Sequence, residues 1–337
     1  MSDAALNEVR GRVQKGVAAT YDGGRLTSLE PLTGGASSLT YVADVEHGGG
    51  REKIVVKVAP PGLAPVRNRD VLRQARVQRA LNSSGRWLTP PVQFEDAGDP
   101  PEAPPFMAMQ LLPGRCVEPA LTVAEARPTA AQTHARFLDA ARMLARIHAV
   151  VPAEVGLAEE PVMTLEAEIA RWVRAFETVP PELQGDFRTG EAALLRTVPG
   201  QLPPVINHGD YRLGNTLCEG ASVVAVIDWE IWSVGDPRVD VTWLTFFTDE
   251  AAHPASEPCG PAGSPSRAEL VAAYEAVHGT PLPDMVWFDA LTKYKEAAAT
   301  ALLLKRALKA GRELNSRNQK MLPAVPNLVR EAIDLVS

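Results

Sequence analysis

The sequence is poor in cysteine and has no long apolar run. Its three cysteines are an odd number without a C-x-x-C spacing, which excludes a disulfide framework and a zinc knuckle: Cys116, Cys218 and Cys259. No run approaches the roughly 18 apolar residues of a membrane span, and the first residues lack the apolar core of a signal peptide. These absences predict a cytoplasmic protein that does not cross a membrane.

An excess of basic residues is also missing. The formal net charge is −7 over 337 residues, which disfavours nucleic acid and anionic membranes as partners. A hydrophobic content of 45% is enough for a sizeable core, and the length predicts about two domains. Composition does not specify an oligomeric state.

The two commonest nucleotide-binding motifs, GxxxxGK[ST] and GxGxxG, are absent. A glycine-rich stretch, TGGASS, joins two expected strands and can present backbone N–H groups to phosphate oxygens, because glycine lets the chain approach closely. An ordinary hairpin turn explains the stretch equally well. Its candidate phosphate-binding residues are Gly34, Gly35, Ala36, Ser37 and Ser38.

The texture of the chain changes near residue 112. Before this point, β-branched and glycine-punctuated stretches predict a small antiparallel sheet with a helix over 67–82 and a last strand over 106–112. After it, apolar residues recur at helical spacing over 134–150, 165–179 and 287–311. The order predicts an α+β protein with an amino-terminal domain over 1–112 and a carboxyl-terminal domain over 113–337.

The strongest local signal is HGDYRLGN, residues 208–215, followed by VIDWE at the end of an apolar run. Asp210 can accept a proton from an attacking hydroxyl, and Arg212 can meet phosphate charge. Asn215 and Asp228 offer the hard oxygen ligands that Mg²⁺ prefers. The alternative is a polar turn and a helix, both capped by these side chains.

Other polar residues near this loop have structural explanations. We expect His208 to support the loop rather than act as a base, because Asp210 already fills that role. His148 lies on an apolar helical stripe, which is typical of a hydrogen-bonded core histidine. Asp236 and Asp240 either orient the loop through its backbone amides or cap the following helix, and we favour a structural role.

These motifs carry a resemblance to a known family. HGDYRLGN and IDWE resemble the catalytic loop and the metal-binding motif of the aminoglycoside phosphotransferase family, small-molecule relatives of protein kinases. TGGASSLTY resembles the nucleotide-positioning loop of that family, Lys57 in IVVKVA its third-strand lysine, and MQLLPG its adenine-binding hinge. In detail the motifs look closest to the branch related to kinase domains fused to acyl-CoA dehydrogenases.

The resemblance implies a two-lobed protein-kinase-like fold and transfer of the γ-phosphoryl group of ATP or GTP to a hydroxyl of a small molecule. Asp210 would be the base, with Arg212 facing phosphate and Asn215 and Asp228 binding Mg²⁺. Lys57 would bind the nucleotide phosphates, and the backbones of two hinge residues, Gln110 and Leu112, would contact the adenine edge. The branch favours a hydroxylated metabolite or hydroxyacyl-CoA as acceptor over an aminoglycoside. A nucleotide-binding scaffold that has lost transfer is the alternative from another class.

One position departs from the family pattern. The helix after the lysine strand usually carries a glutamate that pairs with the lysine, and Gln74 stands there in this sequence. A neutral amide offers a weaker hydrogen bond than a carboxylate. We therefore expect Lys57 to point toward this helix, within reach of Gln74, of Asp70 one turn earlier, or of a bridging water. Without the resemblance, Lys57 would be read as a lysine on a solvated strand face.

Overall fold

The computed structural model describes residues 3–32, 38–85, 88–311 and 313–337. The chain divides into two compact units. Unit 1 contains residues Met1–Gly114 and two later segments, Ala153–Ala158 and Val224–Trp232, and unit 2 contains the remainder. The sequence predicted two continuous domains, 1–112 and 113–337, whereas unit 1 also includes two later segments of the chain. The predicted domain limits therefore stay a prediction.

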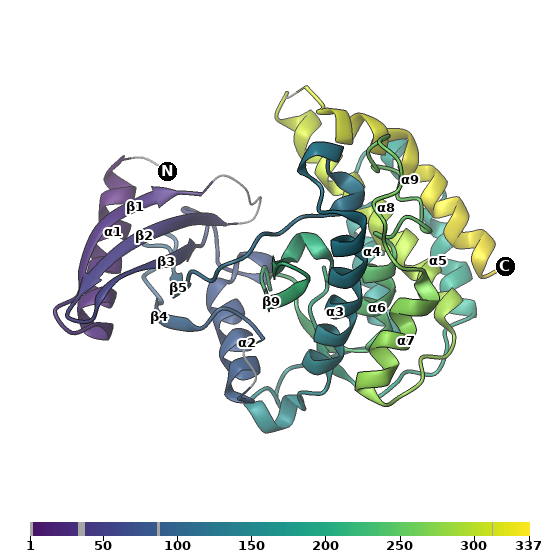
Figure 1. The fold of residues 1–337 in the computed structure, drawn as a ribbon. Coiled ribbons are helices and arrows are strands. Elements are labelled where there is room, and N and C mark those ends of the chain that lie inside the picture. The colour runs from purple at the N-terminus through teal and green to yellow at the C-terminus, as the bar shows by residue number, and fades with distance from the viewer. Residues whose placement is uncertain (1–2, 33–37, 86–87, 312) are drawn as a thin grey trace. The chain divides into compact units, whose positions relative to one another are not determined.

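Unit 1 is built on a five-stranded sheet in the order β1-β2-β3-β5-β4, with every neighbouring pair antiparallel (Figure 1). Its helices and strands are α1 (Asp3–Thr20), β1 (Arg25–Pro31), β2 (Leu39–His47), β3 (Gly50–Val58), α2 (Val71–Ser83), β4 (Val92–Asp96) and β5 (Phe106–Gln110). The antiparallel sheet expected for this part of the chain is therefore confirmed.

The two helices of unit 1 pack on opposite faces of this sheet. Three valines spaced by four residues on α1 pack with Ile54, Val56 and Val58 of β3. Successive strand residues point to opposite faces, so Val55 lies on the other side, where it packs with Val71 of α2. Lys57 shares the α2 face of β3 with Val55.

Unit 2 is mostly helical. Its helices are α3 (Ala130–His148), α4 (Leu165–Phe176), α5 (Phe187–Arg196), α6 (Arg238–Thr245), α7 (Arg267–His278), α8 (Met285–Lys309) and α9 (Ser316–Leu335). α3 begins four residues earlier than its apolar stripe, because Thr129 and Gln132 form a capping box at its start. Figure 1 shows α3 beside α7 and α8 beside α9.

Unit 2 also contains short strands, which are connected by loops. β6 (Val162–Met163), β10 (Ser233–Gly235) and β7 (Val205–Asn207) form a small sheet in that order. β8 (Thr216–Glu219) follows, and the boundary between the units falls within β9 (Ser222–Val226). The main core of unit 2 is formed by α4, α5, α6, α8 and α9, and the first four of these helices contribute its aromatic side chains. The loop that holds the strongest sequence motif, residues 208–215, directly follows β7.

The α+β, two-lobed class expected from the sequence is confirmed. Among the described residues, no helix combines the length and the apolar character needed to cross a bilayer.

Candidate active site

The loop over 208–215 follows β7 in unit 2 and is held through its own backbone. Gly209 has a φ of 86°, a conformation that residues with a side chain rarely adopt. The N–H groups of His208 and Gly209 both donate to the carboxylate of Asp240, that of Gly209 at 2.8 Å. Asp240 is fully buried on α6 and makes no side-chain cap, since Pro237 occupies the N-cap position. Asp240 therefore orients the loop, and the helix-capping role that we favoured from the sequence is wrong for this residue.

Buried groups behind Asp240 support it. His148 Nε2 lies 3.6 Å from Asp240 Oδ2, and His148 Nδ1 lies 2.7 Å from the hydroxyl of Tyr274. Burial would raise the pKa of Asp240, but His148 and the nearby His208 and Lys295 hold this pKa below its usual value. His148 is the core histidine that we expected, and it also supports the loop.

The two remaining structural expectations are confirmed. His208 Nδ1 accepts the backbone N–H of Asp210 at 3.1 Å, so His208 acts as a scaffold of the loop. Asp236 forms a fully buried ion pair with Arg238 at 2.8 Å and accepts the N–H of Leu202 at 2.9 Å. Asp236 therefore stabilises the segment that leads into α6.

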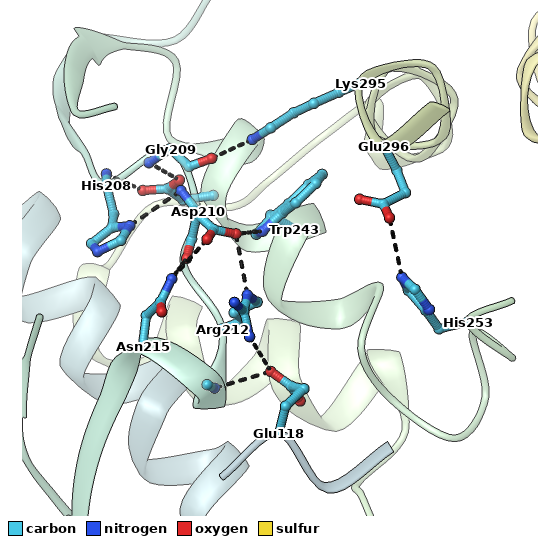
Figure 2. Close-up of polar contacts among 12 residues, drawn as sticks. Glu118, His208, Gly209, Asp210, Arg212, Asn215, Trp243, His253, Lys295 and Glu296 are labelled. Atoms are coloured by element: carbon cyan, nitrogen blue, oxygen red, sulfur yellow. Dashed lines mark hydrogen bonds and ion pairs between the residues drawn. The ribbon is translucent and has the colours of Figure 1, made fainter. Parts of the chain in front are cut away.

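The carboxylate of Asp210 is bound by three side-chain donors (Figure 2). Oδ1 accepts the indole N–H of Trp243 at 2.6 Å and Arg212 Nε at 3.3 Å. Oδ2 accepts the amide N–H of Asn215 at 2.8 Å, and the same nitrogen donates to the backbone carbonyl of Asp210 at 2.8 Å. About a third of the Asp210 side chain is still exposed. The carboxylate is therefore fixed in direction and reachable from solvent.

Asn215 has one amide atom for the loop and one for a ligand. Because its nitrogen is taken by Asp210, its carbonyl oxygen is the atom that can bind a cation. No cluster of three or more His, Cys, Asp or Glu that could hold a metal occurs among the described residues. A single oxygen such as that of Asn215 fits Mg²⁺, which commonly uses one or two protein oxygens together with substrate phosphates.

Glu118, which no sequence motif indicated, holds the second half of the loop. Its Oε2 accepts the N–H of Gly214 at 3.0 Å and lies 3.6 Å from Arg212 Nη1. Burial raises the pKa of Glu118 to about 7, although Arg212 and the N–H of Gly214 oppose the shift. A Cβ on Gly214 would lie 1.9 Å from Arg212 Nη1, so glycine gives Arg212 the room to reach Glu118. The one sequence signal was an acid inside the apolar stretch VEPAL.

Arg212 is thus held between two carboxylates. Asp210 and Glu118 lie on either side of it, and its guanidinium carbon is 5.5 Å from the centre of the Phe247 ring. Burial would lower the pKa of Arg212, but the two carboxylates hold it above its usual value. Arg212 therefore keeps its positive charge beside Asp210.

Trp243 and Lys295 were also missed. Trp243 belongs to α6 and Lys295 to the middle of α8, and both side chains are buried. Lys295 Nζ lies 3.9 Å from the centre of the Trp243 ring and donates a hydrogen bond to the carbonyl of Gly209 (Figure 2). A lysine within an alanine-rich helix looks like a surface residue in the sequence, and only packing reveals its position.

In unit 1, Lys57 pairs with Asp228. Lys57 Nζ donates to Asp228 Oδ1 at 2.7 Å, and the lysine is 7% exposed, which excludes a solvated strand face. Asp228 follows β9 with a φ of 67°, which costs on the order of 1–3 kcal/mol for a residue other than glycine. Backbone strain of this kind collects at functional sites.

The partner expected for Lys57 was wrong. The amide nitrogen of Gln74 donates to the carbonyl of Asn68 at 3.3 Å, and its buried oxygen has no hydrogen-bond partner among the described residues. Asp70 caps α2 by accepting the N–H of Arg73 at 2.9 Å. The expectation missed Asp228 because it considered only the helix next to β3.

Another contact attaches α2 within unit 1. The guanidinium of Arg73 lies 3.9 Å from the centre of the Trp232 ring and donates to the carbonyl of Trp232 at 3.0 Å. The indole N–H of Trp232 in turn donates to the carbonyl of Arg73 at 3.2 Å. This pair ties α2 to the segment that carries Asp228.

The remaining predicted nucleotide contacts lie in two places. Gly34, Gly35, Ala36 and Ser37 fall outside the described residues, and Ser38 precedes β2. Gln110 ends β5, where its N–H donates to the carbonyl of Pro91 at 2.9 Å, and Leu112 follows beyond the strand. Their contacts with nucleotide stay predictions.

Known proteins are similar to this chain over the region that contains these motifs. The model of the phosphotransferase enzyme family, APH, matches residues 28–285, which is more than half of the chain. Acyl-CoA dehydrogenase family member 11 of Pongo abelii is 23% identical over 271 residues, covering 77% of this chain. The chain spans about a third of the length of that relative, 34%.

Solved structures share the fold over nearly the whole chain. A "putative aminoglycoside phosphotransferase" from Ralstonia eutropha JMP134 has a TM-score of 0.73 at 20% identity, with 98% of both chains covered. Aminoglycoside phosphotransferase APH(4)-Ia, in a ternary complex with ADP and hygromycin B, has a TM-score of 0.61 at 14% identity, with 96% of this chain and 98% of that chain covered. At these identities the likeness concerns the fold.

Proposed function

The chain belongs to the phosphotransferase enzyme family, and from this premise we propose that it transfers the γ-phosphoryl group of ATP or GTP to a hydroxyl of a small molecule. The observation that carries the proposal is the carboxylate of Asp210, fixed by Trp243, Arg212 and Asn215 while part of it stays exposed. A base in this state can meet an incoming hydroxyl without first reorganising.

Each residue of the two motifs has a task in this proposal. Asp210 accepts the proton of the acceptor hydroxyl, and Arg212 offsets the negative charge of the phosphoryl group. The oxygens of Asn215 and Asp228 would hold Mg²⁺, and the bound ion would neutralise charge on the nucleotide phosphates. Lys57 exchanges its bond with Asp228 for the phosphates when Mg-nucleotide binds. The glycine-rich residues and the hinge backbone bind the rest of the nucleotide.

Two comparisons bear on the donor and the acceptor. ATP is the better supported donor, because a protein of the same fold was crystallised with ADP. The relative named as an acyl-CoA dehydrogenase favours a hydroxyacyl-CoA or another hydroxylated metabolite. An aminoglycoside is the second candidate, since the neighbour of the same fold holds hygromycin B. A nucleotide-binding scaffold without transfer is the rival from another class.

A screen of acceptors tests the proposal. Wild-type protein with Mg-ATP or Mg-GTP is incubated with hydroxyacyl-CoAs, other hydroxylated metabolites and aminoglycosides, and mass spectrometry detects acceptors that gain a phosphoryl group. Asp210→Asn is the matched control, because it keeps the size of the side chain and removes its basicity. Nucleotide binding without any phosphorylated acceptor would favour the scaffold.

A further inference from the structure

The indole of Trp243 is placed to select one oxygen of Asp210, the base of the proposed function. Its N–H is a donor only, the side chain is 4% exposed, and the 2.6 Å bond to Asp210 Oδ1 is short for a nitrogen donor. Among the described residues, the hydrogen-bond acceptor of the Trp243 indole N–H is Asp210.

Lys295 contacts the face of the Trp243 ring. Its amine stacks 3.9 Å from the centre of the indole ring and bonds the carbonyl of Gly209, the residue before Asp210. A cation on the ring face is attracted to the π electrons and draws electron density from the ring, which makes the indole N–H a stronger donor. One buried side chain of α8 thus holds both Trp243 and the backbone of the loop.

The lone pairs of Asp210 are unequally occupied. A carboxylate offers about four acceptor sites, two on each oxygen. Trp243 and Arg212 take both sites of Oδ1, whereas Asn215 takes one site of Oδ2. The remaining site is on Oδ2.

We infer that Trp243 is a positioning residue that makes Oδ2 of Asp210 the proton acceptor, and that Lys295 holds Trp243 in this role. The inference rests on the proposed function.

In the phosphoryl-transfer step, the acceptor oxygen bonds the γ-phosphorus while the bond from this phosphorus to the β,γ-bridging oxygen breaks. The electron pair of that bond leaves with the nucleoside diphosphate. The hydroxyl proton passes to Oδ2 and then to solvent. Without Trp243 the carboxylate can rotate, and neither oxygen is reserved for the hydroxyl.

Trp243→Phe tests the role of the N–H, because it removes the donor and keeps an aromatic ring against Lys295. We expect kcat to fall about 10- to 100-fold, the range for losing a hydrogen bond to a charged group, with the KM values for nucleotide and acceptor within about twofold of wild type. The matched control is Trp287→Phe, since Trp287 is also buried in unit 2 and donates to the carbonyl of Leu194 at 3.2 Å. This control should keep the wild-type kcat.

Lys295→Met tests the support of Trp243, because methionine keeps much of the length and removes the amine. It should lower kcat by a similar factor. In protein labelled with ¹⁵N-tryptophan, the indole N–H signal of Trp243 is the signal that Trp243→Phe removes. Lys295→Met and Asp210→Asn should both shift this signal, and neither should shift that of Trp287.

The outcomes separate the inference from the proposed function. If wild type phosphorylates an acceptor and Trp243→Phe keeps full kcat, the inference fails and the proposed function stands. An indole signal that ignores Asp210→Asn also overturns the inference. If wild type phosphorylates no acceptor, the proposed function fails and the inference fails with it. A loss of kcat at constant KM, together with the shifted signal, establishes both.

Discussion

The two units hold Asp210 and Lys57, the central side chains of the proposed function, in different ways. In unit 2, Asp210 receives three side-chain donors, and the backbone of its loop is bonded by the buried carboxylates of Asp240 and Glu118. In unit 1, Lys57 is held by Asp228, and the buried oxygen of Gln74 beside the same sheet face has no partner among the described residues.

This contrast indicates which parts are preorganised. Several hydrogen bonds that converge on one short loop fix its geometry, so the loop of unit 2 is expected to keep its shape when ligands bind. The ion pair of unit 1 joins two charges that the proposed mechanism needs elsewhere, one for phosphate and one for Mg²⁺. We therefore expect ligand binding to rearrange unit 1 locally and to leave the loop of unit 2 almost unchanged.

The largest effect should come from breaking the preorganised base. Asp210→Asn should reduce phosphoryl transfer by roughly 10²- to 10⁴-fold, the usual contribution of a positioned base. Nucleotide affinity should change little, because Asp210 meets the acceptor. Turnover assays and calorimetry with Mg-nucleotide measure the two quantities. Full activity in a folded variant would remove Asp210 from the mechanism.

Asp228→Ala should lower both nucleotide binding and turnover, by roughly 10²-fold, because it removes a Mg²⁺ ligand and leaves Lys57 as a buried unpaired charge. Calorimetry with and without Mg²⁺ tests the metal-dependent part. Asp228→Asn is the control, since it keeps one oxygen for the metal. If Asp228→Ala binds Mg-nucleotide like wild type, Asp228 is a structural residue only.

Glu118→Gln tests how much ionisation of the buried Glu118 side chain destabilises the loop of unit 2. The folded-state pKa of Glu118, about 7, lies above the value for an unfolded chain. Its stabilising contribution is therefore fully present below the unfolded pKa and is lost as pH rises through about 7. Relative to Glu118→Gln, wild type should lose stability as pH rises from 5 to 7, by at most about 1.4 kcal/mol per pH unit.

Chemical unfolding of both proteins across this pH range measures the difference. Asp289→Asn is a control in unit 2, because burial raises the pKa of Asp289 to about 6 and its effect should end at lower pH. Parallel pH profiles for wild type and Glu118→Gln would contradict the prediction.

The smallest effect should come from Gln74→Glu. The new carboxylate would compete with Asp228 for Lys57, leaving Asp228 to bind Mg²⁺. We expect tighter nucleotide binding or faster turnover by a few-fold at most, as for a charge-assisted hydrogen bond replacing a neutral one. Lys57→Ala should damage both far more.

Gln78→Glu is the matched control for this change. Gln78 lies one turn further along α2, is equally buried, and its side-chain oxygen also has no partner among the described residues. It should give no gain. Restoration of binding or transfer by Gln74→Glu in an otherwise inactive wild type would identify the natural protein as a scaffold.

The sequence by itself determined the fold class, the family and some of the elements. The β-branched run along β3, the helical spacing of apolar residues along α3 and the motifs HGDYRLGN and IDWE are local patterns, and local patterns specify local structure. Tertiary structure decided the partners: Lys57 meets Asp228 across 171 residues, Gly214 meets Glu118 across 96, and Gly209 meets Lys295 across 86. Contacts between distant segments depend on how helices and strands pack, and a single sequence does not display this packing.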